Sequence, residues 1–246
     1  MVKFNNKFEL LNFIKSLYFL DKGTQGECYY NLIDNKVYKI FSSYLEDGIS
    51  YFDIDFYFKF SNVKNKTFIW MTDVIMVDNL CVGYITDYVN GMMLNQVNPL
   101  TINIDLFLRL IKDVNSDIEL VSKNGIQIED LMYNLMYSSD KINIIDFVNY
   151  YYSNLSYEEL LIKNLERFNM VIYYFLIDTY FDDFIRNDIN LLKMYKEKDI
   201  NLEKFINLFR LKLSEYMGYK INVLGQAYLC INKLSKNSPK YIREYK

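Results

Sequence analysis

The chain has 246 residues, 51% of them hydrophobic, which is enough for one large domain or two small lobes. The formal net charge is −3, so no general basic field favours nucleic acid as a partner. There is no histidine, which excludes Ser-His-Asp and Cys-His catalysis, histidine zinc sites and a histidine general base. The three cysteines are scattered, which argues against a disulfide framework or a zinc ribbon and fits a reducing compartment.

The N-terminal stretch, residues 8–20, is amphipathic and does not have the apolar core of a signal peptide. The longest apolar run, residues 170–177, is far shorter than the roughly 20 residues that a membrane helix needs. We therefore expect a soluble, cytoplasmic protein that has no membrane partner.

The N-terminal third of the chain predicts two β-hairpins with a helix between them. Residues 29–33 and 37–41 flank a turn at 34–36, and residues 67–77 and 81–88 flank a turn at 78–79. Between the hairpins, apolar residues recur at helical spacing: Ile49, Phe52, Phe56 and Phe60. We expect this stripe to be core packing and not a ligand site.

After Asn90-Gly91 and Pro99 the sequence becomes mostly helical. A buried stripe predicts a long helix that ends before Asn124-Gly125; its positions are Phe107, Ile111, Val114, Ile118 and Val121. Two short β-type runs follow, at 134–137 and 142–147, around a turn at 138–141.

A capping box at residues 156–159 begins another helix, whose inward positions are predicted to be Leu161, Leu165, Phe168 and Ile172. Two or three further helices are expected up to about residue 233. Their acidic residues are expected on a solvated face, although they could receive a cationic substrate: Asp178, Asp182, Asp183 and Asp188. The basic tail at 233–246 is interpreted as solvated, with docking to an acidic partner as the alternative.

Gly23-Thr24-Gln25-Gly26 precedes the first hairpin, and Lys39 lies inside its second strand. A buried lysine is costly unless a negative partner is present. A turn folded over phosphates and a strand lysine aimed at the same phosphates would explain both features; an ordinary turn with an edge-strand lysine is the alternative. The acidic partner of Lys39 stays open between Asp55, which we favour weakly, Asp53 and Glu46.

A second group of polar residues follows the long helix: Asp130, then Asn134, then a predicted hairpin that ends in Asp146-Phe147. These are the groups that phosphoryl transfer needs. The first acid would orient or deprotonate an acceptor hydroxyl, while an asparagine oxygen and the last aspartate would hold magnesium on nucleotide phosphates. Ordinary loop carboxylates are the alternative.

The order of these parts, with a hinge-like segment at 85–91 between lysine and acid, resembles the protein-kinase-like superfamily. The resemblance covers about residues 20–149 and is to small bacterial kinase-like proteins and atypical kinases, including aminoglycoside phosphotransferases, more than to eukaryotic-type Ser/Thr kinases. It implies a bilobal α+β fold, with a small β-rich N-lobe at 1–88 and a helical C-lobe at 89–246.

The resemblance also implies an ATP- and Mg-dependent phosphotransferase that acts on a hydroxyl of a protein or a small molecule. Lys39 would contact the α- and β-phosphates, Asp130 would be the catalytic acid, and Asn134 and Asp146 would be the metal ligands. The remaining nucleotide-binding residues would be the glycine-rich turn and a hinge that offers backbone groups to adenine: Gly23, Thr24, Gln25, Gly26, Asp87, Tyr88 and Val89.

Several positions depart from the family pattern. Asp21 stands where the first glycine of the turn is usual, and Ile128 and Glu129 replace the usual His and Arg. Asn134 follows Asp130 by four residues where five is usual, so Glu129 could take the place of the acid, although Asp130-Leu131 is the family's usual pairing.

The segment after Asp146 departs as well. Val148 replaces a glycine and lacks its conformational freedom, and the short distance to Ser156 leaves no room for a long activation segment. We therefore do not expect regulation by activation-loop phosphorylation. The departures sustain an alternative function, a pseudokinase that acts as a nucleotide- or partner-binding module. Nucleotidyl transfer and an unrelated α+β fold are lesser alternatives.

Overall fold

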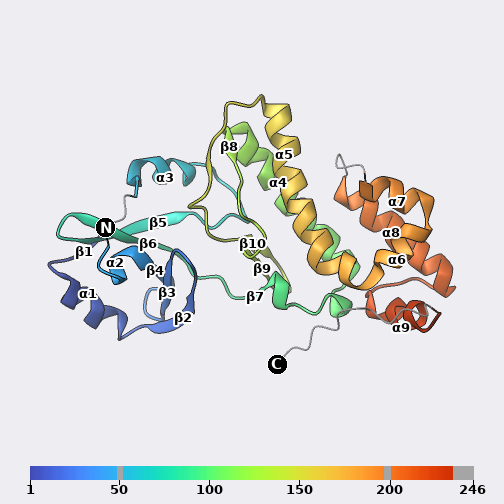
Figure 1. Ribbon diagram of the computed structural model, residues 1–246, viewed down its shortest axis with the longest axis horizontal. Coiled ribbons are helices and arrows are strands. Elements are labelled where there is room, and N and C mark those ends of the chain that lie inside the picture. Colours follow the sequence, from blue (N-terminus) through green and yellow to red (C-terminus); the bar gives the residue numbers. More distant parts are fainter. Residues whose placement is uncertain (49–51, 197–200, 235–246) are drawn as a thin grey trace. The chain divides into compact units, whose positions relative to one another are not determined.

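A computed structural model of the protein describes residues 1–48, 52–196 and 201–234 (Figure 1). The chain is mixed α+β and forms two compact units. Unit 1 comprises Met1–Lys64 and Ile69–Asn90, and unit 2 comprises Asn65–Phe68 and Gly91–Lys246. Ile49 and the predicted basic tail beyond residue 234 lie outside the described residues. Within the described ranges, no helix is both long and apolar enough to cross a membrane.

Unit 1 contains a six-stranded mixed sheet in the order β1-β5-β6-β4-β3-β2. The parallel pair is β1 with β5, and the other neighbours are antiparallel. The strands are β1 (Val2–Phe4), β2 (Tyr18–Lys22), β3 (Gly26–Asn31), β4 (Lys36–Phe41), β5 (Met71–Val77) and β6 (Leu80–Asp87). Both predicted hairpins are confirmed, and positive φ angles in their turns fall on Asn and Asp, which tolerate them: Asn35, Asp78 and Asn79.

Two strand boundaries differ from the prediction. The sequence does not predict β2, because residues 8–20 form one amphipathic stretch. That stretch is divided between α1 (Lys7–Ile14) and the exposed edge strand β2. β5 begins at Met71 and not at residue 67, because the backbone and hydroxyl of Thr67 make their hydrogen bonds to groups of unit 2.

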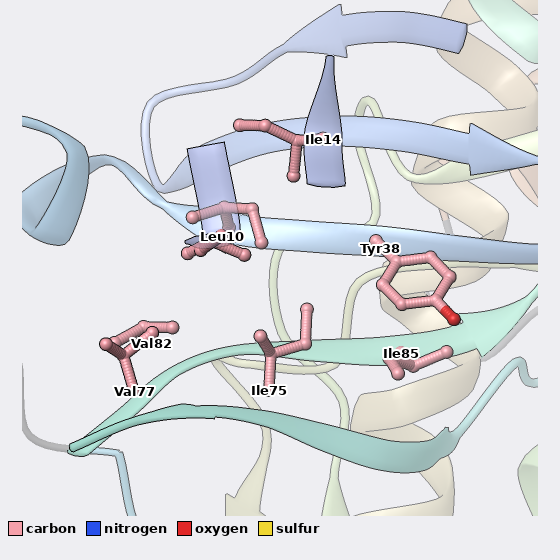
Figure 2. Packing of buried hydrophobic residues seen from close by; sticks show 8 residues of the cluster. Leu10, Ile14, Tyr38, Ile75, Val77, Val82 and Ile85 are labelled. Atoms are coloured by element: carbon pink, nitrogen blue, oxygen red, sulfur yellow. The ribbon is translucent and has the colours of Figure 1, made fainter. Parts of the chain in front are cut away.

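The two faces of the sheet are covered differently. Leu10 and Ile14 of α1 pack on one face against Tyr38 and Ile40 of β4 and other strand residues, as Figure 2 shows for most of this cluster. Because side chains alternate along a strand, Lys39 and Phe41 point to the opposite face. Phe41, Phe52 and Tyr84 form an aromatic cluster there with α3 (Ile54–Phe60). Phe52 and Phe60 are buried, which confirms their predicted place in the core.

In unit 2 two long helices lie side by side, α4 (Ile104–Lys123) and α5 (Tyr157–Ile172) (Figure 1). All five positions of the predicted stripe on α4 are buried, and Gly125 follows the helix at φ 72°. Short strands surround the loops that carry the polar residues: β7 (Met92–Met93), β8 (Ile126–Gln127), β9 (Leu135–Tyr137), β10 (Ile142–Ile144) and β11 (Tyr151–Tyr152). β10, β9 and β7 form one sheet, and β11 pairs with β8.

The capping box of Ser156 and Glu159 at the start of α5 is confirmed. The predicted inward face is wrong in part. Phe168 and Ile172 are buried, but Leu161 and Leu165 are only half-buried. Leu160 and Asn164 are buried in their place, because Asn164 turns inward to bond the loop after β8.

Among the described residues after α5 there are four helices and a π-helical turn (Tyr173–Asp178), where the sequence predicts two or three helices. The helices are α6 (Thr179–Asn187), α7 (Ile189–Lys196), α8 (Leu202–Met217) and α9 (Gly225–Leu234). The predicted solvated acidic face is wrong for two positions. Asp178 is half-buried, and burial raises the pKa of its carboxyl. Asp188 accepts from the backbone amides of Asn190 and Leu191 and thereby caps α7.

Candidate functional site

The loop after β8 is held at its start by a buried amide of α5. Asn164 is completely buried, and its Oδ1 accepts from the backbone N–H of Ile128 at 2.9 Å. Its Nδ2 donates to the carbonyl of Ile126 at 3.0 Å and to the Ser122 hydroxyl at 2.9 Å. A buried amide with its hydrogen bonds satisfied fixes the backbone around it, so residues 126–128 are anchored to α4 and α5 together.

Glu129, the next residue, forms an ion pair with Arg167, one helical turn after Asn164. The two guanidinium nitrogens reach the two carboxylate oxygens at 2.5 and 2.7 Å. Gln127 also donates to Glu129 Oε1 at 2.5 Å and contacts the Tyr151 hydroxyl. The Glu129 carboxylate is thus engaged with Arg167 and Gln127, whereas the next residue, Asp130, is exposed.

Asp130 is exposed and adopts a left-handed backbone conformation, with φ 54°. Its carbonyl accepts from Asn134 Nδ2 at 2.6 Å, and its Oδ2 accepts from Asn149 Nδ2 at 3.3 Å. Because the amide nitrogen of Asn134 is used locally, its Oδ1 is the atom that this side chain can offer to a cation. These contacts bring Asp130 and Asn134 together in one turn.

Asp146 is tied to the same turn through the backbone. The N–H of Ile145 donates to the carbonyl of Asn134 at 2.9 Å, so the residue before Asp146 touches the predicted metal ligand directly. Asp146 itself is left-handed, with φ 59°, and its Oδ1 accepts from the N–H of Val148 at 3.4 Å. The positive φ therefore falls on the aspartate, and Val148 does not need the freedom of a glycine.

Left-handed backbone at a residue other than glycine costs roughly 1–2 kcal/mol. The other such residues in the described ranges lie in hairpin turns or directly after a short helix: Asn35, Asp47, Asp78 and Asn79. Asp130 and Asp146 are the two that lie outside such positions. Strain of this kind collects at functional sites, where the surrounding contacts hold it in place.

A buried tyrosine lies among the acidic residues. Tyr150 is 2% exposed, and its pKa is raised well above the usual range by burial and then by the charges of Asp146, Asp130 and Glu129. The charges of three carboxylates thus disfavour ionisation of this buried tyrosine. Phe147 is also buried, so the Asp-Phe pair points its aromatic member into the core.

The strand that leads to Asp146 is anchored by a buried carboxylate on α4. Asp117 is 3% exposed, and its Oδ2 accepts three hydrogen bonds at 2.8 Å, from the amides of Lys66 and Thr67 and from the Thr67 hydroxyl. The carbonyl of Thr67 in turn accepts from Ile144 in β10 at 2.8 Å. Asp117 therefore fixes the segment on which the strand before Asp146 is built.

The oxygen atoms of this loop pair suit magnesium. In the described part of the chain, no group of three or more His, Cys, Asp or Glu side chains could hold a metal by itself. Asp146 and Asn134 would offer two hard oxygen ligands. Magnesium in nucleotide sites is usually bound by one or two protein ligands, with waters and phosphates completing the octahedron, so these residues fit it.

In unit 1, the glycine-rich turn connects β2 and β3. The N–H of Gly23 donates to the carbonyl of Gly26 at 2.9 Å and closes the turn. A Cβ at Gly26 would come within 3.0 Å of the Ile40 carbonyl, so sheet packing alone requires this glycine. A Cβ at Gly23 would be 3.9 Å from its nearest neighbour, so among the described residues packing does not explain why Gly23 is a glycine.

Lys39 is 8% exposed and lies beside this turn. Its Nζ donates to Gln25 Oε1 at 3.4 Å and lies 5.4 Å from the centroid of the Tyr84 ring. The strand register places Asp21, Cys28 and Lys39 in one row on the same face. Asp53 caps α3 through the amide of Phe56, and an acidic partner for Lys39 stays a prediction.

The hinge-like residues lie at the end of β6. The Asp87 carboxylate pairs with Lys36 Nζ at 2.5 Å, and the Tyr88 ring stacks on Tyr30 at 4.0 Å between centroids. The N–H of Tyr88 donates to the carbonyl of Asn35 at 3.2 Å. This amide is therefore not available to an adenine ring, which leaves the backbone of Val89 and the carbonyl of Asp87 as the groups to consider.

Sequence reasoning missed the residues that hold the loops: Asn164, Arg167, Asn149 and Asp117. Asn164 carried a signal, because it lies four residues after Leu160 and four before Phe168 and so interrupts an apolar stripe. A polar residue in such a stripe needs a buried partner. The partners of Arg167 and Asp117 lie far away in sequence and gave no local signal.

Comparisons with known proteins assign no family to this chain. No protein-family model matches the sequence, and a search of curated proteins finds no significant relative. A function for this protein has to be inferred from the geometry of its own residues.

Proposed function

We propose that this protein is an ATP- and Mg-dependent phosphotransferase of the protein-kinase-like type, which moves the γ-phosphate to a hydroxyl of a protein or small molecule. The observation that carries the proposal is the hydrogen bonding of Asn134 to Asp130 and to Ile145, the residue before Asp146, with both aspartates in left-handed conformations. The kinase-like bilobal fold, with unit 1 as N-lobe and unit 2 as C-lobe, is part of the proposal.

Each residue has a chemical task in this proposal. Asp130 accepts the proton of the acceptor hydroxyl or orients it, and its exposure allows a substrate to reach it. Asn134 and Asp146 would hold magnesium, which neutralises phosphate charge as it develops. Lys39 would contribute a positive charge to the phosphates, and the backbone of the turn from Gly23 to Gly26 would cover them.

The segment after Asp146 is short and is held in place by contacts of its own, which supports a site that needs no phosphorylation to become ordered. Tyr150 follows at once in the core, and β11 then pairs with β8, next to the anchored start of the Asp130 loop. α5 begins soon afterwards at Tyr157. No long segment is left that phosphorylation could order.

The test is the formation of ADP from Mg-ATP, with mass spectrometry for phosphate added to the protein itself or to candidate hydroxyl compounds. Asp130→Asn and Asp146→Asn should each lower turnover by about 100-fold or more. The matched control is Asp140→Asn, since Asp140 is an exposed acid in the β9–β10 turn and accepts only from Ser138 in the described structure. Turnover that survives Asp146→Asn unchanged would contradict the proposal.

A second candidate is a pseudokinase that binds a nucleotide or a partner without transferring phosphate. Two contacts favour it. The Tyr88 amide is already used by Asn35, and the buried Lys39 has contacts within its own unit, to Gln25 and Tyr84. Binding of Mg-ATP with no ADP formed across a panel of hydroxyl substrates would favour this candidate.

A further inference from the structure

The ion pair between Glu129 and Arg167 occupies the residue next to the proposed catalytic acid. Both guanidinium NH₂ groups are used, one on each carboxylate oxygen, at 2.5 and 2.7 Å. The side chains of Arg167 and Glu129 are only 31% and 23% exposed. A two-pronged pair in this setting restricts the carboxylate in position and in orientation, which a single contact does not.

The pair is part of a larger attachment of the loop to α5. Asn164 holds the backbone of Ile128, and Arg167, three residues later on the same helix face, holds the side chain of Glu129. Gln127 adds a further hydrogen bond to the Glu129 carboxylate. Two consecutive residues of the loop are thus fixed to one rigid helix immediately before Asp130.

Asp130 adopts the left-handed conformation directly after this attachment. A left-handed aspartate is higher in energy than its extended or helical alternatives, so something must keep the chain from relaxing. Asp130 itself accepts a hydrogen bond from the Asn134 side-chain amide at its carbonyl and a longer one from the Asn149 side-chain amide at its carboxylate. The stronger restraint lies one residue earlier, at Glu129.

We propose that Glu129 and Arg167 are positioning residues that hold Asp130 in its left-handed conformation. The loop after β8 would then keep its active conformation without any covalent modification. Neither residue touches the substrate in this scheme. The catalytic benefit of this positioning rests on the proposed function. The effect of the ion pair on the backbone at Asp130 can be tested without a substrate.

The experiment is amide hydrogen exchange on the full chain without nucleotide, followed in peptides that cover residues 126–137. Arg167→Ala should speed exchange there by about tenfold or more, while peptides of β5 and β6 in unit 1 keep their wild-type rates. Arg167→Lys keeps the charge and loses the two-pronged geometry, and should give an intermediate rate. Where Arg167→Ala does not fold, Glu129→Gln removes the same ion pair with a side chain of the same shape.

Reversal of the pair supplies the rescue. The double variant Glu129→Arg with Arg167→Glu should restore most of the protection that either single change removes, because the two opposite charges face each other again. Arg186→Ala is the matched control. It breaks an exposed ion pair to Asp182 at 2.7 Å on α6 and should leave exchange at 126–137 unchanged.

Unchanged exchange at 126–137 in Arg167→Ala and Glu129→Gln would overturn the positioning role. So would faster exchange of equal size throughout unit 2, or a reversed pair that restores nothing. Failure of the proposed function would give a different result. The wild type would form no ADP, although Arg167→Ala would still speed amide exchange at residues 126–137. In an active enzyme, Arg167→Lys should lower kcat while KM stays near its wild-type value.

Discussion

The residues predicted to bind the nucleotide in unit 1 differ from the acidic loops of unit 2 in how far packing explains them. Gly26 is required by the nearby carbonyl of Ile40, and the buried Lys39 has contacts to Gln25 and Tyr84 within its sheet. An ordinary β-sheet could contain both. In unit 2, exposed or half-exposed aspartates stand in strained conformations, and buried side chains of α4 and α5 hold the surrounding chain.

The difference shows where the functional evidence lies. A glycine or a buried lysine has several structural uses, so its presence says little by itself. A strained carboxylate at the surface has a cost and no packing gain, and it persists only where other contacts enforce it. The proposal of phosphoryl transfer therefore depends mainly on Asp130 and Asp146, and the following experiments separate the two regions.

The largest effect is expected for the proposed catalytic acid. Asp130→Asn should lower phosphate transfer by about 10²–10⁴-fold, the usual contribution of a positioned general base. Asparagine tolerates left-handed backbone, so the free energy of unfolding should change by less than about 0.5 kcal/mol. Steady-state kinetics and urea unfolding measure the two quantities. A loss of activity that only follows a loss of stability would count against the assigned role.

The buried anchor of unit 2 should matter for stability. Asp117→Ala leaves three donors around Lys66 and Thr67 without their acceptor and should destabilise unit 2 by about 3 kcal/mol. Asp113→Ala is the control, because it removes only the exposed partner of Lys66 at 3.1 Å and should cost about 0–1 kcal/mol. Equal costs for the two variants in urea unfolding would show that the anchor is not a special feature of this unit.

The two glycines of the turn in unit 1 should separate packing from binding. Gly26→Ala places a methyl group against the Ile40 carbonyl and should destabilise the protein by about 1–3 kcal/mol. Gly23→Ala has room for its methyl group and should leave the unfolding free energy nearly unchanged. If the turn covers phosphates, Gly23→Ala should still weaken Mg-ATP binding, which calorimetry measures. Unchanged affinity would leave the turn with a structural role only.

The smallest effect concerns Asp178, a half-buried acid of unit 2 whose backbone is not strained. Burial raises the pKa of its carboxyl in the folded state above the unfolded value, so the folded protein binds the extra proton more readily. Its contribution to stability is therefore most favourable at low pH and falls as the pH rises from the unfolded pKa through the raised folded pKa.

Asp178→Asn should accordingly raise the Tm slightly at pH 7, and the difference from wild type should shrink as the pH is lowered towards 4. Thermal scans of both proteins from pH 4 to 7 check this. A variant that is less stable at pH 7 would show that the ionised carboxylate makes a favourable contact that outweighs its burial.

Local patterns predicted much of the fold. The two hairpins of unit 1, the α4 stripe and the capping box of α5 each depend on residues a few positions apart, and all were confirmed. The edge strand β2 was missed because its exposed aromatic residues do not alternate with polar ones. The inward orientation of Asn164 was missed because its hydrogen-bond partners lie 36 to 42 residues away in sequence.

In the candidate site too, residues close together in sequence were predicted, and contacts between distant residues were not. The order of Asp130, Asn134 and Asp146 along the chain marked them as candidates, and the structure brings the three together. The ion pair of Glu129 with Arg167 and the anchor at Asp117 join residues 38 and 50 positions apart. Such pairs depend on how α4 and α5 pack, which no periodicity in a single sequence reveals.

A thermal-unfolding scan with Mg-ATP, on wild type and on Asp146→Asn, tests the central claim most directly. Ligand at about a hundred times its dissociation constant adds about 2.7 kcal/mol, which corresponds to a rise of roughly 5–10 °C for a chain of this size. We predict this rise for the wild type, its dependence on magnesium, and its loss in Asp146→Asn. An equal rise in both proteins, or no rise with any nucleotide, would contradict the assignment of Asp146 as a metal ligand and with it the proposed phosphotransferase.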